Sequence, residues 1–260
     1  MNILETIVKD KIMELEKAKT KCSLEELRKL ASERVNSTSR RRFSSIFRSN
    51  YLALIAEVKL KSPSKGVLTN KTHIEIASMY AKSDVDAISV LTETKYFNGQ
   101  LSYLEDVRNI APQPILRKDF IIDEYQVYET LIAGADAFLL IASILGLSQL
   151  KNLVRLGKRL GLESLVEIHN QDDLEKALAV GAEIIGINNR DLASLKTDLQ
   201  TSVVLMPKIP QGKFVVSESG IESTKDAKLL KSLHVYGVLV GSSIIESNDP
   251  VGFISQLKSV

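Results

Sequence analysis

Short apolar runs rich in branched residues alternate with amphipathic helical stretches from Leu52 to the C-terminus. Strands that alternate with helices form a parallel sheet, because each helix carries the chain back to the start of the next strand. The pattern predicts strands at Leu52–Lys59, Ala87–Thr92, Ile115–Lys118, Ala137–Ala142, Ser164–Ile168, Ile184–Asn188, Phe214–Glu218 and Gly237–Gly241. It predicts helices at His73–Lys82, Tyr125–Ala133, Leu147–Leu160, Gln171–Val180, Ser223–Leu233 and Pro250–Lys258.

The number of βα units decides between the two common parallel architectures. About eight units within roughly 210 residues favour an α/β fold of the closed (β/α)8 TIM-barrel type. A doubly wound open sheet is the alternative, but no glycine-rich dinucleotide-binding fingerprint follows the first strand. We therefore predict a single TIM barrel over residues 51–260.

The residues before the barrel are expected to be helical. Apolar side chains recur near helical spacing at Ile3, Ile7, Ile12 and Leu15. Ser23 and Glu26 form a capping-box pattern before a second helix. We predict that residues 1–50 form an N-terminal helical extension on the barrel, so that residues 1–260 make one domain.

A basic stretch, Asn36–Arg48, joins the extension to the barrel and contains the run Arg40-Arg41-Arg42. Such a run can bind nucleic acid, but a solvated helix face or a linker is the commoner origin. The chain as a whole has 34 Lys+Arg against 32 Asp+Glu, a formal net charge of +2. We therefore interpret the stretch as a linker or solvated helix face.

Composition limits the partners and the compartment. A net charge of +2 is too small to attract nucleic acid or a membrane by bulk electrostatics, so an anionic ligand needs a local site. The N-terminus lacks the features of a signal peptide, and no run approaches the roughly 18 apolar residues of a membrane span. The chain has one cysteine, Cys22, so it cannot form a disulfide framework, which fits a reducing cytoplasm. We interpret Cys22 as a small residue near a helix start. The histidines show no metal-ligand spacing, so no metal is expected.

Charged and amide side chains stand at the carboxyl ends of the predicted strands. Side chains alternate along a strand, so residues two apart point to the same side of the barrel wall. Catalytic groups of TIM barrels come from this end. One charge there is readily explained as a buried ion pair, but a ring of them over apolar interior runs predicts an active site. The ring comprises Glu57, Lys59, Lys118, Glu167, Asn188 and Glu218.

Small residues after the last two strands suggest a phosphate site. Backbone N–H groups of Ser219-Gly220 and Gly241-Ser242 can approach an anion, and barrel phosphate sites commonly lie there. Ser242 can equally cap a helix. A Ser-rich basic loop over 61–66 follows the first strand and is expected to be mobile over the barrel mouth. The mouth is expected to be cationic through Lys59, Lys61, Lys118 and Arg190.

These segments together resemble the indole-3-glycerol phosphate synthase family. The resemblance rests on Ile55-Ala56-Glu57-Val58-Lys59 with Ser62-Pro63-Ser64, Leu91-Thr92-Glu93 with Tyr96-Phe97-Asn98-Gly99, Leu116-Arg117-Lys118-Asp119-Phe120, Leu165-Val166-Glu167, Ile185-Gly186-Ile187-Asn188-Asn189-Arg190-Asp191-Leu192, Val216-Ser217-Glu218-Ser219-Gly220-Ile221 and Val240-Gly241-Ser242-Ser243. They occur in the family's order from before residue 55 to near the C-terminus. The helical extension also resembles the family's extra segment over the barrel mouth.

The resemblance implies a cofactor-free lyase of tryptophan biosynthesis. Its substrate would be a small phosphorylated molecule, 1-(2-carboxyphenylamino)-1-deoxyribulose 5-phosphate, and its products indole-3-glycerol phosphate, carbon dioxide and water. By the resemblance, Lys118 is the general acid and Glu167 the second acid/base. Glu57 lies near the reacting centre, and Lys59 orients the anionic substrate. Asn188 and Glu218 surround the sugar hydroxyls.

The resemblance also implies binding residues. Arg190 and Ser62 would contact anionic groups of the substrate. Ser219, Gly220, Gly241 and Ser242 would hold the phosphate. Phe97, Phe120 and Leu139 would wall the slot for the anthranilate ring, with a plain core role for Leu139 as the other interpretation.

Three other functions compete with this one. A phosphoribosyl isomerase would use a cysteine or a second acid beside a carboxylate, yet Cys22 lies outside the barrel and Lys118 would be idle. A Schiff-base aldolase would use Lys118 as a nucleophile with a lowered pKa. A catalytically silent phosphometabolite-binding protein would not need both Lys118 and Glu167. The oligomeric state does not follow from the sequence, and a monomer is the working expectation.

Overall fold

The barrel closes through eight parallel strands. The structure is a computed structural model that describes residues 3–37, 41–191 and 194–260, with only the backbone of 35–37. Leu192 of the family motif and Arg40 of the basic run therefore lie outside the described residues. The ring runs in chain order and β1 pairs with β10 to close it. Its strands are β1 (Ala53–Val58), β4 (Ala87–Leu91), β5 (Ile115–Lys118), β6 (Ala137–Ile141), β7 (Glu163–Ile168), β8 (Ile184–Asn188), β9 (Phe214–Glu218) and β10 (Gly237–Val240). The TIM-barrel prediction is confirmed, and each strand lies within one residue of its expected bounds.

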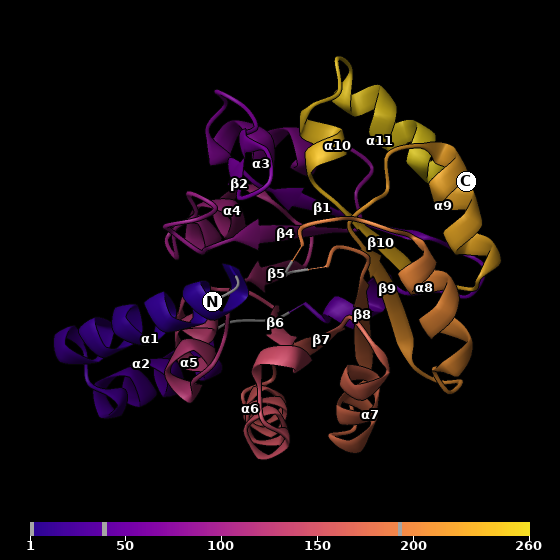
Figure 1. Cartoon of the computed structure of the whole chain (residues 1–260). Helices are drawn as coiled ribbons and strands as arrows, with labels where there is room; N and C mark the ends of the chain where they lie inside the picture. The colour runs from indigo at the N-terminus through magenta and orange to yellow at the C-terminus, as the bar shows by residue number, and fades with distance from the viewer. Residues whose placement is uncertain (1–2, 38–40, 192–193) are drawn as a thin grey trace.

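Helices surround the ring, as Figure 1 shows. They are α3 (His73–Ala81), α4 (Tyr103–Ile110), α5 (Glu124–Ile132), α6 (Leu147–Arg159), α7 (Gln171–Ala179), α8 (Gln200–Leu205), α9 (Thr224–Ser232), α10 (Ser242–Ile245) and α11 (Pro250–Lys258), with short 3-10 turns η1 (Phe43–Ile46), η2 (Ala142–Ile144) and η3 (Met206–Lys208). The sequence did not predict α4, α8 or α10. All three are at most eight residues long, so each offers too few turns for a clear helical period.

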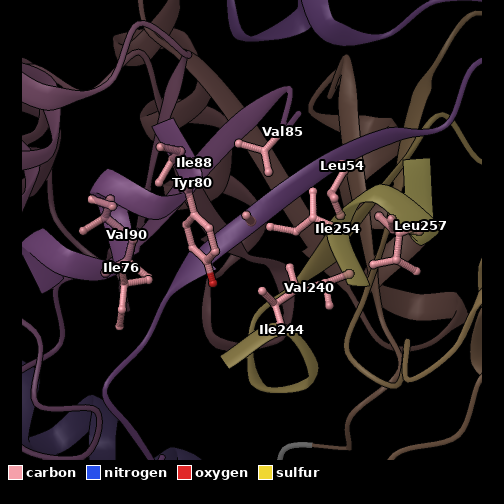
Figure 2. Close-up of a cluster of buried hydrophobic side chains, with 14 of the residues drawn as sticks. Leu54, Ile76, Tyr80, Val85, Ile88, Val90, Val240, Ile244, Ile254 and Leu257 are labelled. Carbon is pink, nitrogen blue, oxygen red and sulfur yellow. The ribbon is translucent and has the colours of Figure 1, made fainter. Parts of the chain in front are cut away.

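The strands separate two apolar layers by simple alternation. Leu54 and Val58 of β1 point outward and pack with Tyr80 of α3 and Ile254 of α11, a cluster drawn in Figure 2. Ile55 of β1 belongs instead to the cluster inside the barrel. Interior neighbours from the other strands include Leu116, Leu139, Leu165, Ile184 and Val216. Residues two places beyond these interior positions therefore point into the barrel at the carboxyl ends of the strands.

The N-terminal extension consists of α1 (Ile3–Lys21) and α2 (Leu24–Ser37), which lie side by side near α5 in Figure 1. The predicted capping box is present, since Ser23 Oγ accepts from the Glu26 N–H at 3.2 Å and the Glu26 carboxylate accepts from the Ser23 N–H at 2.7 Å. Lys11 of α1 is buried and its Nζ lies 3.1 Å from Asp119 Oδ1, directly after β5. The Lys11–Asp119 contact ties α1 to the barrel. That residues 1–260 form one domain, with residues 1–50 as its extension, stays a prediction.

Within the basic stretch, Asn36 and Ser37 belong to α2, and residues 41–48 pack against the barrel. The Arg41 guanidinium donates to the carbonyls of Ala111 and Gln113, both at 3.2 Å. After it, Phe47 stacks on Phe214 with ring centroids 5.1 Å apart. Residues 41–48 therefore contact the barrel itself, and for the whole stretch the interpretation as a linker or solvated helix face stays a prediction.

Candidate active site

One cavity at the carboxyl ends of the strands collects the residues that the sequence proposed for catalysis or binding, except Lys61 of the expected cationic mouth. Glu57, Lys118, Glu167, Asn188 and Glu218 are the last or next-to-last residues of β1, β5, β7, β8 and β9, and each follows an interior apolar or small residue by two positions. The remaining predicted residues line the same cavity: Lys59, Ser62, Phe97, Phe120, Leu139, Arg190, Ser219, Gly220, Gly241 and Ser242. The alternation of the barrel wall thus brings together groups that lie far apart in the sequence.

Lys118 stands between two carboxylates. Its Nζ lies 3.0 Å from Glu167 Oε2 and 3.3 Å from Glu218 Oε2. Both glutamate side chains are about 1% exposed, whereas Lys118 keeps 14% of its side chain accessible from the cavity. Charges buried this deeply are retained only when they are paired. The lysine is therefore the group of this cluster that a ligand meets first.

The three charges do not share the cluster equally. Burial alone favours neutral Lys118, but Glu167 and Glu218 outweigh burial and raise the pKa of its ammonium above the ordinary value. Burial of Glu167 is likewise outweighed by Lys118 and His169, which lower the pKa of that carboxyl. Burial and repulsion by Glu167 outweigh Lys118 at Glu218 and raise its pKa to about 8. At neutral pH the cluster therefore holds a charged lysine, an ionised Glu167 and a protonated Glu218.

A second ion pair lies beside an aromatic wall. Lys59 Nζ is 3.3 Å from Glu57 Oε1 and 5.7 Å from the centre of the Phe97 ring. Phe97 faces Phe120 with ring centroids 6.3 Å apart, and Leu139 adds an apolar surface to the same cavity. Sequence reasoning missed the contribution of α1, whose Leu4 and Ile7 also line this cavity. The resemblance implied a segment over the barrel mouth, but helical spacing alone does not say which side chains of that segment reach the cavity.

The opposite side of the cavity consists of small residues in special backbone conformations. Ser219 and Gly220 follow β9 with φ of 65° and 80°, so two successive residues adopt the left-handed region. A side chain at Gly220 would place its Cβ 2.7 Å from Thr197 Cγ2. Gly241 and Ser242 follow β10, and Ser242 begins α10. Successive N–H groups in such turns form a concave site for an anion.

The expected cationic mouth needs one correction. Lys61 lies over a separate surface groove with Lys71 and Tyr103 and does not line the cavity formed by the described residues. Lys65 lines the cavity in its place, because the loop folds into a hairpin of β2 (Lys61–Ser62) and β3 (Gly66–Val67) that turns Lys61 away. Arg190 donates to Ser64 Oγ at 3.3 Å and to the Leu195 carbonyl at 3.0 Å. Among the described residues it has no carboxylate partner, so its charge is available to a ligand.

The Glu218 side chain leaves no room for a side chain at Gly186 of β8. A Cβ added there would lie 2.1 Å from Glu218 Oε1 and 2.5 Å from Leu165 Cδ2. Gly186→Ala is expected to displace the Glu218 carboxylate, to reduce stability by about 1–3 kcal/mol as overpacking does, and to reduce turnover. Thermal unfolding and steady-state kinetics measure both effects. Gly146→Ala is the matched control, since nothing lies within 4 Å of its added Cβ; equal effects of the two changes would contradict the steric argument.

Comparison with known proteins matches the whole of this arrangement to one family. The model of the family described as indole-3-glycerol phosphate synthase matches residues 4–257. The chain belongs to the indole-3-glycerol phosphate synthase family. Indole-3-glycerol phosphate synthase from Caldanaerobacter subterraneus subsp. tengcongensis is 44% identical over 248 residues, which cover 95% of this chain and 94% of that protein. The synthase from Carboxydothermus hydrogenoformans is 44% identical over 255 residues, covering 95% and 96% of the two chains.

Solved structures show the same barrel fold in proteins outside the indole-3-glycerol phosphate synthase family. The 3-hexulose-6-phosphate synthase of Salmonella typhimurium superposes with a TM-score of 0.64 at 15% identity, over 80% of this chain and 97% of that one. This likeness concerns the fold alone. In the described part of this synthase-family chain, no helix is long and apolar enough to cross a membrane, and no cluster of side chains has the composition of a metal site.

Proposed function

We propose that this chain is a carbon–carbon lyase that converts 1-(2-carboxyphenylamino)-1-deoxyribulose 5-phosphate into indole-3-glycerol phosphate, carbon dioxide and water. The observation that carries the proposal is Lys118 held as an ammonium, 3.0 Å from Glu167, at the centre of a cavity with one apolar side and one side of small residues. Family membership and identity above 40% over nearly the full length support the same reaction. The monomeric state and the cytoplasmic location remain predictions.

In this proposal Lys118 starts the reaction as a proton donor. The aromatic carbon that bears the carboxylate attacks the ketone carbon, and Lys118 gives a proton to the ketone oxygen as the new carbon–carbon bond forms. The ring carbon then loses carbon dioxide, and the electrons of that bond restore the aromatic ring. Lys118 suits the first step because its side chain is the most exposed of the three in this buried charge cluster.

Loss of water completes the indole and requires a second acid/base, which we assign to Glu167. The hydroxyl formed in the first step leaves with a proton, and the neighbouring carbon gives up a proton as the double bond forms. Glu167 is ionised in the free protein and lies within hydrogen-bonding distance of Lys118. Glu57, paired with Lys59, would stand near the same centre, while Asn188 and Glu218 would contact the sugar hydroxyls.

The two sides of the cavity fit the two ends of this substrate. Phe97, Phe120 and Leu139 offer an apolar slot for the anthranilate ring. Ser219, Gly220, Gly241 and Ser242 stand after β9 and β10 and offer N–H groups to the phosphate. Ser62 and the guanidinium of Arg190 add donors near this end. Formation of indole-3-glycerol phosphate from the synthetic substrate, followed by fluorescence, tests the function directly; no product at high enzyme concentration refutes it.

Arg190 is proposed to bind the substrate without taking part in bond changes. Arg190→Ala is therefore expected to raise KM by about tenfold or more, the worth of a hydrogen bond to a charged group, with little change in kcat. The matched control is Lys65→Ala, which also removes a cation at the mouth, but one already paired with Glu246 at 2.7 Å. A fall in kcat with unchanged KM in Arg190→Ala would contradict the anchoring role.

A further inference from the structure

His169 directly follows β7 and reaches back to Glu167. Its Nε2 lies 3.3 Å from Glu167 Oε1, on the carboxylate oxygen that Lys118 leaves free. The imidazole is 13% exposed and is not among the described residues that line the cavity. A substrate in the cavity would therefore touch Lys118 and Glu167 but not His169. Any influence of His169 on the reaction must pass through the Glu167 carboxylate.

A second carboxylate holds the other side of the ring. Asp173 Oδ2, at the start of α7, lies 3.6 Å from His169 Nδ1 and also accepts the His169 backbone N–H at 3.1 Å. The N-cap Asn170 accepts the Asp173 N–H at 2.9 Å, so the first turn of α7 fixes the position of Asp173. Asp173, His169, Glu167 and Lys118 thus form a row of alternating charges. The row runs from the buried first turn of α7 to the cavity.

We propose that His169 is a positioning residue, which as an imidazolium held by Asp173 keeps the Glu167 carboxylate oriented and ionised while Lys118 acts on the substrate. This inference rests on the proposed function, because Glu167 is the second acid/base of that reaction. Neither ring nitrogen makes a well-directed hydrogen bond to a described residue, so the contact with Glu167 is mainly one of charge.

The need for a second cation follows from the reaction itself. Lys118 is the main countercharge of Glu167 in the free protein. Once Lys118 has given its proton to the ketone oxygen, an isolated Glu167 at about 1% exposure would itself take up a proton. His169 leaves a positive charge 3.3 Å from Glu167 at that moment. The carboxylate then remains available as a base for the dehydration.

The titratable groups facing the imidazole come from three elements. They are Glu167 of β7, Asp173 of α7 and Glu218 of β9, with Lys118 of β5 one carboxylate further away. Burial disfavours the charged ring, but Asp173 and Glu167 outweigh burial and raise the pKa of His169 above its ordinary value. The charges of Asp173 and Glu167 therefore favour the imidazolium form of His169 in the position that the distances give it.

The kinetic test compares two histidine variants. In His169→Asn the acid limb of the kcat profile is expected to move up by about one pH unit or more, because an opposite charge near Glu167 is lost. KM should stay within twofold. His73→Asn is the matched control, since His73 Nε2 also contacts a carboxylate, Asp106 at 2.8 Å, and is 15% exposed, outside the cavity. His73→Asn should leave the profile unchanged. An unshifted acid limb in both His169→Asn and His169→Gln overturns the proposal.

A second measurement does not depend on activity or on a histidine variant. Titration of the imidazole by NMR should give a lower pKa for His169 in Glu167→Gln than in the wild-type protein, by about one unit or more. An identical titration in both proteins overturns the inference. If the wild-type protein forms no indole-3-glycerol phosphate, the proposed function fails. If product forms but neither the acid limb nor the titration moves, the inference about His169 alone fails.

Discussion

Lys118→Met is expected to reduce kcat by about a hundredfold to ten-thousandfold, the usual contribution of a positioned general acid. The ketone would lose the proton donor that the proposal assigns to it, because methionine carries no ammonium. Lys59, which is 3.3 Å from Glu57, has the separate role of orienting the substrate in this proposal. Methionine preserves most of the volume of the side chain, so the loss reports on the charge. Steady-state fluorescence kinetics with the carboxyphenylamino substrate measure it.

The substitution also leaves Glu167 and Glu218 without their shared cation, so folding must be checked by circular dichroism and thermal unfolding. Lys176→Met is the matched control: Lys176 is a half-buried lysine of α7 that donates to the Ala142 carbonyl at 3.1 Å, outside the cavity. Turnover within a few-fold of wild type in Lys118→Met would contradict the general-acid role. A fall in both variants would point to stability instead.

The same lysine distinguishes the synthase from a Schiff-base aldolase. A nucleophilic lysine must be neutral, whereas Glu167 and Glu218 outweigh burial and raise the pKa of Lys118. Borohydride is therefore expected to trap no covalent adduct between the wild-type protein and a keto substrate. A stable adduct lost in Lys118→Met would favour the aldolase.

Alternation explains how much of the site the sequence could predict. Each of Glu57, Lys118, Glu167, Asn188 and Glu218 is two residues beyond an interior apolar or small residue, and that spacing is readable once the strands are found. Loop positions carry no such rule. Lys61 and Lys65 stand in one basic loop, and only the hairpin register of Lys61 with Val67 decides that Lys65 faces the cavity.

The sequence also could not predict how deeply each carboxyl is buried or which charges contact it. Glu167 and Glu218 are the same residue type near the carboxyl ends of β7 and β9, on either side of β8, yet the pKa of one carboxyl is lowered and that of the other raised. The difference arises because His169 contacts Glu167 and no comparable described cation contacts Glu218 besides Lys118. A sequence pattern gives strand positions but not the distances that set these interactions. The histidines, His169 among them, were considered from the sequence only as metal ligands.

Glu167→Gln is expected to reduce kcat by about a hundredfold to ten-thousandfold, because the amide can neither accept nor donate the proton needed for dehydration. The wild-type acid limb should lie below the ordinary range of a glutamate, since the pKa of Glu167 is lowered. Below that limb the carboxyl is protonated and activity falls. A pH profile of kcat measures the acid limb. If the same acid limb were present in Glu167→Gln, the assignment of Glu167 as the second acid/base would be contradicted.

Glu218→Gln provides the matched comparison, because Glu218 is also about 1% exposed and 3.3 Å from Lys118. Its pKa of about 8 means that Glu218 carries a proton below that pH, and glutamine resembles a protonated carboxyl in shape and charge. At neutral pH this variant should therefore keep far more turnover than Glu167→Gln. Above about pH 8 the wild-type Glu218 ionises and adds a second buried negative charge beside Glu167, so an alkaline limb is expected there. That limb should disappear in Glu218→Gln. If the limb persists in the variant, Lys118 rather than Glu218 controls the alkaline side of the reaction.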